Sequence, residues 1–235
     1  MSPARPRDHV VVREIDRTPV SLVDLLGAMG TATVHEALGR RGALGPDLRP
    51  IQQDVKVAGT AITVLSHPGD NLMIHAAVEV CARGDLLVVV NTAPSTHGMF
   101  GELLATSLTA RGVRGLVIDA GVRDTADLRR MGFPVWSRHV SVHGTVKASP
   151  GSVNVPVAVD GVVIEPGDVV CADDDGVVVV PRADAAWAVE QCEARVAKED
   201  RTREQLRRGL LGVDLYGLRE RLGELGVRYV DGLDG

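Results

Sequence analysis

The stretch GLVIDAGVRDTADL, residues 115–128, joins a buried-strand pattern to two adjacent opposite charges. Its apolar run ends at Asp119, and Arg123 and Asp124 follow side by side before a helical pattern begins. Asp124 is typical of a helix N-cap, with Asp127 three residues later as in a capping box. The pair is also typical of a ligand site, because the carboxyl ends of strands face the binding crevice in α/β folds. These residues alone leave both interpretations open.

Apolar runs alternate with helical patterns on both sides of this stretch. The run DLLVVVN, residues 85–91, is typical of a buried strand, and a helix is expected over residues 101–111 between it and GLVID. The alternation continues in four more segments: strands at 55–66 and 133–137, and helices at 71–84 and 124–132. Each apolar run is separated from the next by a helix, which predicts β-α-β units and an α/β fold.

The chain changes character between residues 144 and 181, where valine, glycine and proline dominate. Asp-Gly and Pro-Gly pairs recur there, which predicts antiparallel strands joined by tight turns. The triple acid at 173–175 precedes a glycine between two valine-rich runs, so a hairpin turn is favoured over a metal site. This region therefore adds antiparallel strands to the β-α-β units.

A charged helix over residues 183–209 and a short amphipathic tail end the sequence. No Gly/Ser linker separates them from the rest, and the helix is too polar to bury itself. We therefore expect a single α/β catalytic domain at 1–182 and a helical tail at 183–235. The tail is expected to pack on the core and on a neighbouring subunit.

The composition limits the classes to which this protein can belong. A chain of 235 residues with 45% hydrophobic content is long enough for a proper core, and its net charge of −5 gives no basic field for a nucleic acid. Cys81, Cys171 and Cys192 are odd in number and lack a C-x-x-C pattern, so we expect thiols in a reducing compartment. The sequence shows no signal-peptide core and no run of about 18 apolar residues, which predicts a cytoplasmic protein without a membrane segment.

The segment THGMFGELLATS, residues 96–107, places two glycines before a helix. Free N–H groups at such a helix start, here residues 101–104, can hold a carboxylate or a developing enolate oxygen, although many ordinary helices also start after glycine. Glu102 is favourable in a first turn whatever its function. If the β-α-β units are adjacent, Glu102 faces the same crevice as Arg123 and Asp124. One cation and two carboxylates there would suit a hard ion such as Mg²⁺.

Two other kinds of site are less well supported by the sequence. Lys56 and Lys147 are candidate Schiff-base lysines, but neither is flanked by acid or base partners, so metal use is favoured over imine chemistry. His35, His75 and His97 are not spaced as a zinc set. The crevice that holds the arginine and the two acids is therefore the favoured site.

Several motifs together are similar to one known family. They are HPGDN at 67–71, FGELLATSLTARGVRGLVIDAGVRDTADL at 100–128, then FPVWS, GTVK, GSVNVPV, PGDVVCADDDGVVVVP and LLGVDLYGLRERL. Over nearly the whole chain, the sequence resembles the class II pyruvate aldolases of the 4-hydroxy-4-methyl-2-oxoglutarate and 4-carboxy-4-hydroxy-2-oxoadipate type. It resembles most the 4-carboxy-4-hydroxy-2-oxoadipate aldolases of aromatic-acid degradation. The wider fold family also contains regulators of ribonuclease E, which are not aldolases.

The resemblance implies a fold, an assembly and a metal. The fold would be a swivelling α-β-β-α sandwich with a mixed central β region and a C-terminal helical tail, assembled as a homotrimer or homohexamer with active sites between subunits. Asp124 would coordinate Mg²⁺ or Mn²⁺ directly, with water filling much of the remaining shell. Glu102 would contact metal-bound water, at a position where Asp is usual. Glu199 would do the same from the neighbouring subunit.

The resemblance also implies the substrate contacts. Arg123 would bind the pyruvyl carboxylate and keto oxygen, and Asn71 and His75 would line the pocket. Groups at the start of the helix expected over residues 101–111 would bind the carboxylate end of the substrate: Gly101, Leu103 and Leu104. His97 stands at the pocket edge, where an acid would be expected.

The implied activity is metal-dependent retro-aldol cleavage of 4-carboxy-4-hydroxy-2-oxoadipate to pyruvate and oxaloacetate. 4-Hydroxy-4-methyl-2-oxoglutarate would be a second substrate, and oxaloacetate decarboxylation a side activity, because all three give the same pyruvate enolate. The expected partners are a small 2-keto acid and other copies of the chain, not nucleic acid or a membrane. Two alternatives remain: a non-catalytic, protein-binding regulator of ribonuclease activity on the same fold, and an aldolase or decarboxylase for another 2-keto acid.

Overall fold

The computed structural model describes residues 9–232. Residues 1–8, part of the N-terminus in which the sequence shows no signal-peptide core, and residues 233–235 lie outside the described residues. The helices are α1 (Val20–Met29), α2 (Thr31–Ala37), α3 (Leu72–Val78), α4 (Glu102–Ala110), α5 (Thr125–Met131), α6 (Ala185–Arg207), α7 (Gly212–Leu215) and α8 (Leu218–Glu224), with a 3-10 turn η1 (Arg182–Asp184). The strands are β1 (Arg49–Pro50), β2 (Val57–Ser66), β3 (Asp85–Asn91), β4 (Gly98–Phe100), β5 (Leu116–Val122), β6 (Val135–Val140), β7 (Ser152–Val153), β8 (Val157–Val159), β9 (Val162–Ile164), β10 (Val169–Asp173) and β11 (Gly176–Val180).

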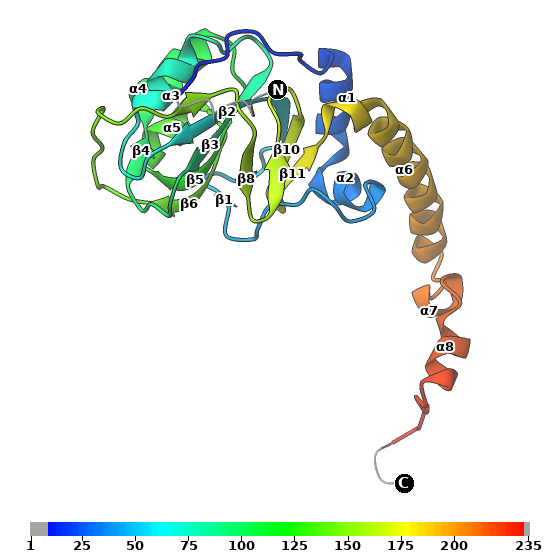
Figure 1. The fold of residues 1–235 in the computed structure, drawn as a ribbon. Helices are drawn as coiled ribbons and strands as arrows, with labels where there is room; N and C mark the ends of the chain where they lie inside the picture. Colours follow the sequence, from blue (N-terminus) through cyan, green and yellow to red (C-terminus); the bar gives the residue numbers. More distant parts are fainter. Residues whose placement is uncertain (1–8, 233–235) are drawn as a thin grey trace, which may run out of the picture. The chain divides into compact units, whose positions relative to one another are not determined.

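Nine of the strands described between residues 9 and 232 form one mixed sheet (Figure 1). Its order is β1-β6-β5-β3-β2-β10-β11, with β4 paired to β5 and β7 paired to β2. β2, β3, β5 and β6 run parallel, as the β-α-β pattern predicts, whereas β7, β10 and β11 pair antiparallel. β8 and β9 form a separate hairpin. The structure thus confirms the predicted α/β fold with a mixed central β region.

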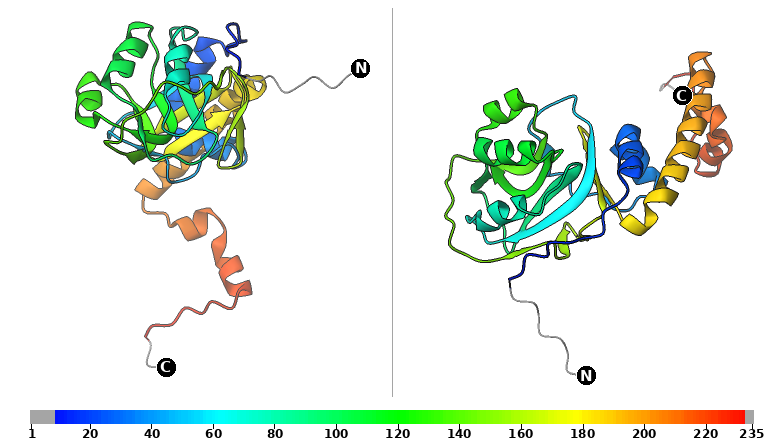
Figure 2. Two further views of the ribbon diagram at one scale, coloured as in Figure 1. Left: turned by 60° about the vertical axis from the view of Figure 1, so that its left-hand side comes forward. Right: turned by 90° about the horizontal axis from the view of Figure 1, so that it is seen from above.

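The sheet curls so that its two halves pack face to face, with helices outside each half. Val88 of β3 and Val117 of β5 share one buried cluster with Val170 of β10 and Val179 of β11. A second cluster lies under α3, α4 and α5, and a third lies between the β10–β11 half and α1, α2 and the first turns of α6. Figures 1 and 2 show α3 to α5 on one side of the sheet and α1 and α2 on the other. This is the predicted α-β-β-α sandwich, in which apolar strands are buried on both faces.

Tight turns join the antiparallel strands where the sequence predicts them. Asp160 and Gly161, with φ of 50° and 82°, connect β8 to β9, as a type I′ turn requires. The triple acid at 173–175 forms the hairpin turn between β10 and β11. Asp173 also accepts hydrogen bonds from the amide and hydroxyl of Thr31 at the start of α2. The negative charge of Asp173 therefore stabilises the start of α2, where a carboxylate is favourable.

The chain divides into two compact units, with the boundary between Cys192 and Glu193 inside α6. Before the boundary, α6 contributes four buried residues to the third cluster: Ala185, Ala188, Val189 and Cys192. In the second unit, α7 and α8 contain no buried residue. The first turns of α6 thus pack on the core, whereas the packing of the rest of the predicted tail at 183–235 on the core and on a neighbouring subunit stays a prediction. None of the helices that the structure describes is long and apolar enough to cross a membrane.

Cys81 and Cys171 are buried free thiols. Burial raises the pKa of each to about 12, because it disfavours the charged thiolate. Near neutral pH, both therefore stay protonated and behave as small apolar side chains of the core.

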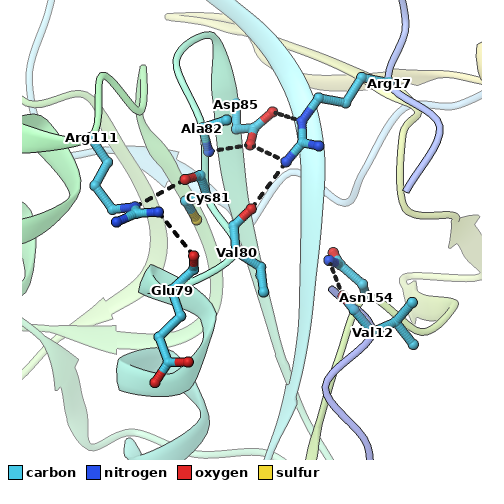
Figure 3. Close-up of polar contacts among 9 residues, drawn as sticks. All are labelled: Val12, Arg17, Glu79, Val80, Cys81, Ala82, Asp85, Arg111 and Asn154. Carbon is cyan, nitrogen blue, oxygen red and sulfur yellow. Dashed lines mark hydrogen bonds and ion pairs between the residues drawn. The ribbon is translucent and has the colours of Figure 1, made fainter. Parts of the chain in front are cut away.

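A buried ion pair fastens the segment before α1 to the start of β3 (Figure 3). Nε and Nη2 of Arg17 each lie 3.0 Å from a carboxylate oxygen of Asp85, whose side chain is only 1% exposed. The same carboxylate accepts the amide of Ala82 at 2.7 Å, and Arg17 also donates to the carbonyl of Val80. Both oxygens of Asp85 are therefore met by donors, which is the condition for burying a charge.

Neighbouring contacts tie the same region together (Figure 3). Arg111 donates from Nε to the Cys81 carbonyl and from Nη2 to the Glu79 carbonyl, both at 2.9 Å. These carbonyls follow the end of α3, where helical acceptors lack partners. Asn154 donates from Nδ2 to the carbonyl of Val12 at 2.8 Å, which holds the N-terminal segment against β7. Segments remote in sequence are thus fixed around the α3–β3 connection.

We expect Asp85→Asn to lower the free energy of unfolding by about 3 kcal/mol, because it leaves Arg17 without its charge partner. Urea unfolding followed by the fluorescence of the buried Trp136 would measure the loss. Asp24→Asn is the matched control, since it removes an ion pair of Arg114 in which the aspartate is 58% exposed, and it should cost less than about 1 kcal/mol. Equal losses in the two variants would contradict the role given to the buried pair.

Candidate active site

Arg123 and Asp124 lie where β5 ends. The Arg123 amide donates to the Phe100 carbonyl at 2.8 Å, which extends the pairing of β4 and β5 by one residue. Asp124 then takes a left-handed conformation with φ of 55°, and α5 begins at Thr125. This conformation is uncommon outside glycine and turns the chain sharply out of the sheet. The two charged side chains are thus placed at the carboxyl end of the parallel strands.

The predicted capping of α5 by the Asp124 side chain is wrong. Asp124 does hold the N-cap position, and its backbone carbonyl accepts the amides of Asp127 and Leu128, each at 3.0 Å. Its carboxylate makes no capping hydrogen bond to this helix. Side-chain caps usually have an extended backbone, whereas the left-handed φ of Asp124 aims its carboxylate elsewhere.

The Asp124 carboxylate instead contacts the start of α4. Its Oδ2 accepts the amide of Glu102 at 3.2 Å and lies 3.6 Å from Nε of Arg123. Gly101 makes this approach possible, because a Cβ there would collide with the same carboxylate. Gly98 acts similarly in β4, since its lack of a side chain leaves room for Arg123. The two glycines therefore allow two β-α-β units to meet at this point.

Glu102 and the first amides of α4 lie within one turn of this contact. The Glu102 carboxylate accepts the hydroxyl of Thr106, four residues along α4, at 2.8 Å. Hydrogen bonding to the preceding turn starts at the amide of Ala105. The amides of Leu103 and Leu104 come before it and have no partner within the helix. The start of α4 thus offers one carboxylate and two N–H groups.

Asp124 lines two hollows. The first, of about 420 Å³, is lined by Arg123, Asp124, Thr125, Val140, Ser141 and Val142. The second, of about 430 Å³, is lined by Glu102, Asp124, Asp127, Arg130 and Met131. The first carries a guanidinium, one carboxylate and two hydroxyls, and the second carries three carboxylates and one guanidinium. The first hollow can therefore take a small carboxylic acid beside Arg123, and the second can take a cation beside Asp124.

Asn71 and His75 lie at the start of α3. The Asn71 side chain is buried, and its Nδ2 donates to the carbonyl of Met99 at 3.2 Å. Met99 directly precedes Phe100, whose carbonyl accepts the Arg123 amide. Asn71 and Arg123 therefore hydrogen-bond to adjacent residues of β4. His75 is exposed at one side, yet desolvation lowers its pKa and the positive charge of Lys147 lowers it further. Its ring is therefore neutral near pH 7.

Three further candidates from the sequence are Glu199, Lys56 and Lys147. Glu199 belongs to the second unit, where its carboxylate pairs with Arg195 at 2.8 Å. Its role in the site of a neighbouring subunit stays a prediction. Both lysines are exposed, whereas a Schiff-base lysine is usually desolvated. Within residues 9–232, no group of three or more His, Cys, Asp or Glu side chains is placed to hold a metal ion.

Sequence reasoning missed two residues that the structure places here. Ser141 lines the first hollow, and its amide donates to the Val122 carbonyl at 2.9 Å. Ser141 lies in a segment without a recognisable motif, so the sequence offered no reason to propose it as a site residue. Thr106 stands four residues after Glu102, a spacing at which helical side chains meet, and this signal was available.

The sequence model of one family, described as "RraA-like: Aldolase/RraA", matches residues 31–179. The chain belongs to the RraA-like family. The matched range contains Asn71, His75 and the residues that line both hollows, whereas Glu199 lies outside it. The family match therefore covers the candidate site as well as most of the first unit.

Two relatives and one solved structure bear on the activity of this RraA-like chain. A Halalkalibacterium halodurans protein named "Putative 4-hydroxy-4-methyl-2-oxoglutarate aldolase" is 24% identical over 202 residues, covering 86% of this chain and 96% of the relative. A Burkholderia multivorans protein of the same name is 35% identical over 143 residues, covering 61% and 87%. Streptomyces coelicolor RraAS2, described as an unusual member of the RNase ES inhibitor RraA protein family, has a structure with a TM-score of 0.74 and 31% identity, covering 81% of this chain and 99% of that one. These relatives support an aldolase or an RraA-type regulator.

We expect Gly101→Ala to lower the free energy of unfolding by about 1 kcal/mol, because the new Cβ would push the exposed Asp124 carboxylate off the Glu102 amide. Gly144→Ala is the matched control, since a Cβ at Gly144 meets nothing within 4 Å, and its effect should stay within about 0.5 kcal/mol. Urea unfolding measures both values. A Gly101 variant as stable as the Gly144 variant would show that the close approach is not required.

Proposed function

We propose that this RraA-like protein is a divalent-metal-dependent pyruvate aldolase. It would cleave 4-carboxy-4-hydroxy-2-oxoadipate to pyruvate and oxaloacetate, and 4-hydroxy-4-methyl-2-oxoglutarate to two molecules of pyruvate. The observation that carries the proposal is the contact of Asp124 with the start of α4, which gathers Arg123, two carboxylates and free helix amides. The relatives named as 4-hydroxy-4-methyl-2-oxoglutarate aldolases support the reaction class.

Substrate binding would rest on Arg123 and on the start of α4. A guanidinium is planar and can hold the carboxylate and the keto oxygen of a 2-keto acid with parallel N–H groups. The amides of Leu103 and Leu104 would hold the carboxylate end, since the N-terminus of a helix favours negative charge. Asn71 and His75 would line the pocket from α3. All these groups bind the pyruvyl half, which every proposed substrate shares.

The donor set at Asp124 fits a hard divalent cation. Asp124 and Glu102 both line the hollow of about 430 Å³, and Mg²⁺ commonly takes one or two carboxylates while keeping several waters. We assign direct binding to Asp124 and binding through water to Glu102. Glu199 of a neighbouring copy would also bind through water. When bound, Mg²⁺ or Mn²⁺ supplies Lewis-acid stabilisation of negative charge on the keto oxygen of the substrate.

Bond cleavage would begin at Glu102, acting as a base through a water that it holds. The C4 hydroxyl gives up its proton, the C4 oxygen becomes a carbonyl oxygen, and the C3–C4 bond breaks. The electron pair of that bond passes to the pyruvyl half as an enolate, whose oxygen Arg123 stabilises. Return of a proton to C3 gives pyruvate. Oxaloacetate that loses CO₂ gives the same enolate, so decarboxylation is the expected side activity.

A second candidate function is that of an RraA-type regulator, which the structural match to RraAS2 favours. A protein of this kind would bind a partner and would have no need of a base at Glu102 or of a metal at Asp124. A third candidate, an aldolase or decarboxylase for another 2-keto acid, would share the site. Turnover with defined substrates separates all three.

We expect purified protein to release pyruvate from 4-carboxy-4-hydroxy-2-oxoadipate in the presence of Mg²⁺. Chelation should abolish the release and added Mg²⁺ or Mn²⁺ should restore it, because the enolate would lose its Lewis acid. A coupled lactate dehydrogenase assay measures the pyruvate. Release that survives thorough chelation would contradict the metal dependence, and no release from any of several 2-keto acids would favour the regulator.

We expect Arg123→Ala and Asp124→Ala each to lower kcat/KM by about 100-fold or more, because the first variant removes the group that stabilises the enolate oxygen and the second removes the proposed direct ligand of the metal. Arg40→Ala provides the control, because this arginine is exposed after α2 and pairs with Glu36. Circular dichroism would verify that the variants are folded. Full activity in either site variant would overturn the assignment of that residue.

A further inference from the structure

Two histidines from distant segments meet beside the candidate site. His97 precedes β4 and His143 follows β6, and their ring centroids lie 5.7 Å apart at an interplanar angle of 52°. The backbone joins the same two places, since the amide of Gly98 donates to the His143 carbonyl at 2.9 Å. No step proposed above uses either ring. Two imidazoles side by side offer two ring N–H groups to one ligand.

The position of the His97 ring is set by its neighbours. Ser95 Oγ lies 3.5 Å from Nδ1 of His97 and also accepts the His97 amide at 3.3 Å. On another side, the ring packs against Gly69, where a Cβ would lie only 3.3 Å from a ring carbon. Nδ1 therefore faces Ser95, and Nε2 is the ring nitrogen that Ser95 does not engage.

This histidine pair, His97 and His143, lies next to Arg123. A Cβ placed on Gly98 would be 3.1 Å from Cβ of Arg123 and 3.3 Å from the His143 carbonyl oxygen. The residue after His97 therefore touches both the arginine and the second histidine. In addition, the segment that lines the Arg123 hollow at Ser141 continues directly into His143. A 2-keto acid held at Arg123 can extend towards the histidine pair.

The charges around the pair favour an anion. Lys147 directly follows Val146, whose amide donates to the Gly69 carbonyl at 3.0 Å, and Gly69 packs against the His97 ring, so Lys147 lies close to the pair. The acid on this edge, Asp70, is buried, and its carboxylate accepts the amides of three residues: Leu72, Ala148 and Ser149. The carboxylates of Glu102 and Asp127 line the other hollow, whereas Asp124 lines both. Arg123 lines only the hollow that Ser141 also lines, on the side of the pair.

We propose that the His97–His143 pair binds a carboxylate carried by the C4 substituent of the substrate, an inference that rests on the proposed aldolase function. The substrate class that the pair selects is a 2-keto acid with three carboxylates. 4-Carboxy-4-hydroxy-2-oxoadipate has a carboxymethyl group at C4, whereas 4-hydroxy-4-methyl-2-oxoglutarate has only a methyl group there. The pair therefore sets the preference between these two substrates, while oxaloacetate has no such group for it to bind.

The test compares three reactions in one set of variants. His97→Ala, His143→Ala and the double variant should lower kcat/KM for 4-carboxy-4-hydroxy-2-oxoadipate by about ten-fold or more, the usual effect of losing a hydrogen bond to a charged group. The loss should lie mainly in KM. Cleavage of 4-hydroxy-4-methyl-2-oxoglutarate and decarboxylation of oxaloacetate should change by less than about two-fold. His97→Gln, which keeps a donor, should recover part of the loss.

His35→Ala is the matched control, because His35 is half-buried like His97 but lies on α2, where its ring meets the Arg41 carbonyl. Calorimetric titration with pyruvate and Mg²⁺ should give the wild-type affinity in all variants, since pyruvate lacks the C4 group. Equal losses on all three substrates, or an unchanged preference, would overturn this inference while leaving the aldolase proposal intact. A wild-type protein that cleaves neither hydroxy-keto acid would overturn both.

Discussion

The hydrogen bond between the Asp124 carboxylate and the Glu102 amide holds the candidate site together. It joins the end of β5 to the start of α4, which belong to consecutive β-α-β units. Parallel pairing brings these units into register, with Val89 of β3 opposite Ile118 of β5. The sheet alone would leave the strand end and the helix start as separate surface features. Because Gly101 lets them touch, the guanidinium, the carboxylates and the helix amides act on one small volume.

Asp124 lies between two hollows of different character, one of them richer in carboxylates. Glu102 and Asp127 lie with Asp124 around one hollow, while Ser141 lies with Arg123 and Asp124 around the other. An aldol substrate has the same polarity, since its hydroxyl must lose a proton while its carboxylates need donors. A regulator that only binds a protein has no need for such a division. The layout is therefore better suited to chemistry on a small polyanion than to a flat contact.

The sequence predicts the local parts of this fold better than the long-range ones. The strand at 85–91 and the turn at Asp160 were predictable because apolar continuity and turn chemistry act within a few residues. The capping box at Asp124 is equally local, but a contact with α4, 22 residues away, takes the carboxylate instead. The ion pair of Arg17 with Asp85 spans 68 residues and left no local signal. The candidate residues Arg123, Asp124 and Glu102 could be proposed from the sequence and its resemblance, whereas their contacts with one another required the fold.

The glutamate at position 102 shows how contacts within the fold affect what a site residue can do. Aspartate is usual there in the aldolases that the sequence resembles, and glutamate adds one methylene. In this chain, the Thr106 hydroxyl draws the Glu102 carboxylate along α4, away from the helix start, at 2.8 Å. The amide of Glu102 meanwhile stays on Asp124. Backbone and side chain are thus held at separate points, and the two carboxylates line one hollow of about 430 Å³. A longer acid fixed in this way suits contact through water better than direct coordination.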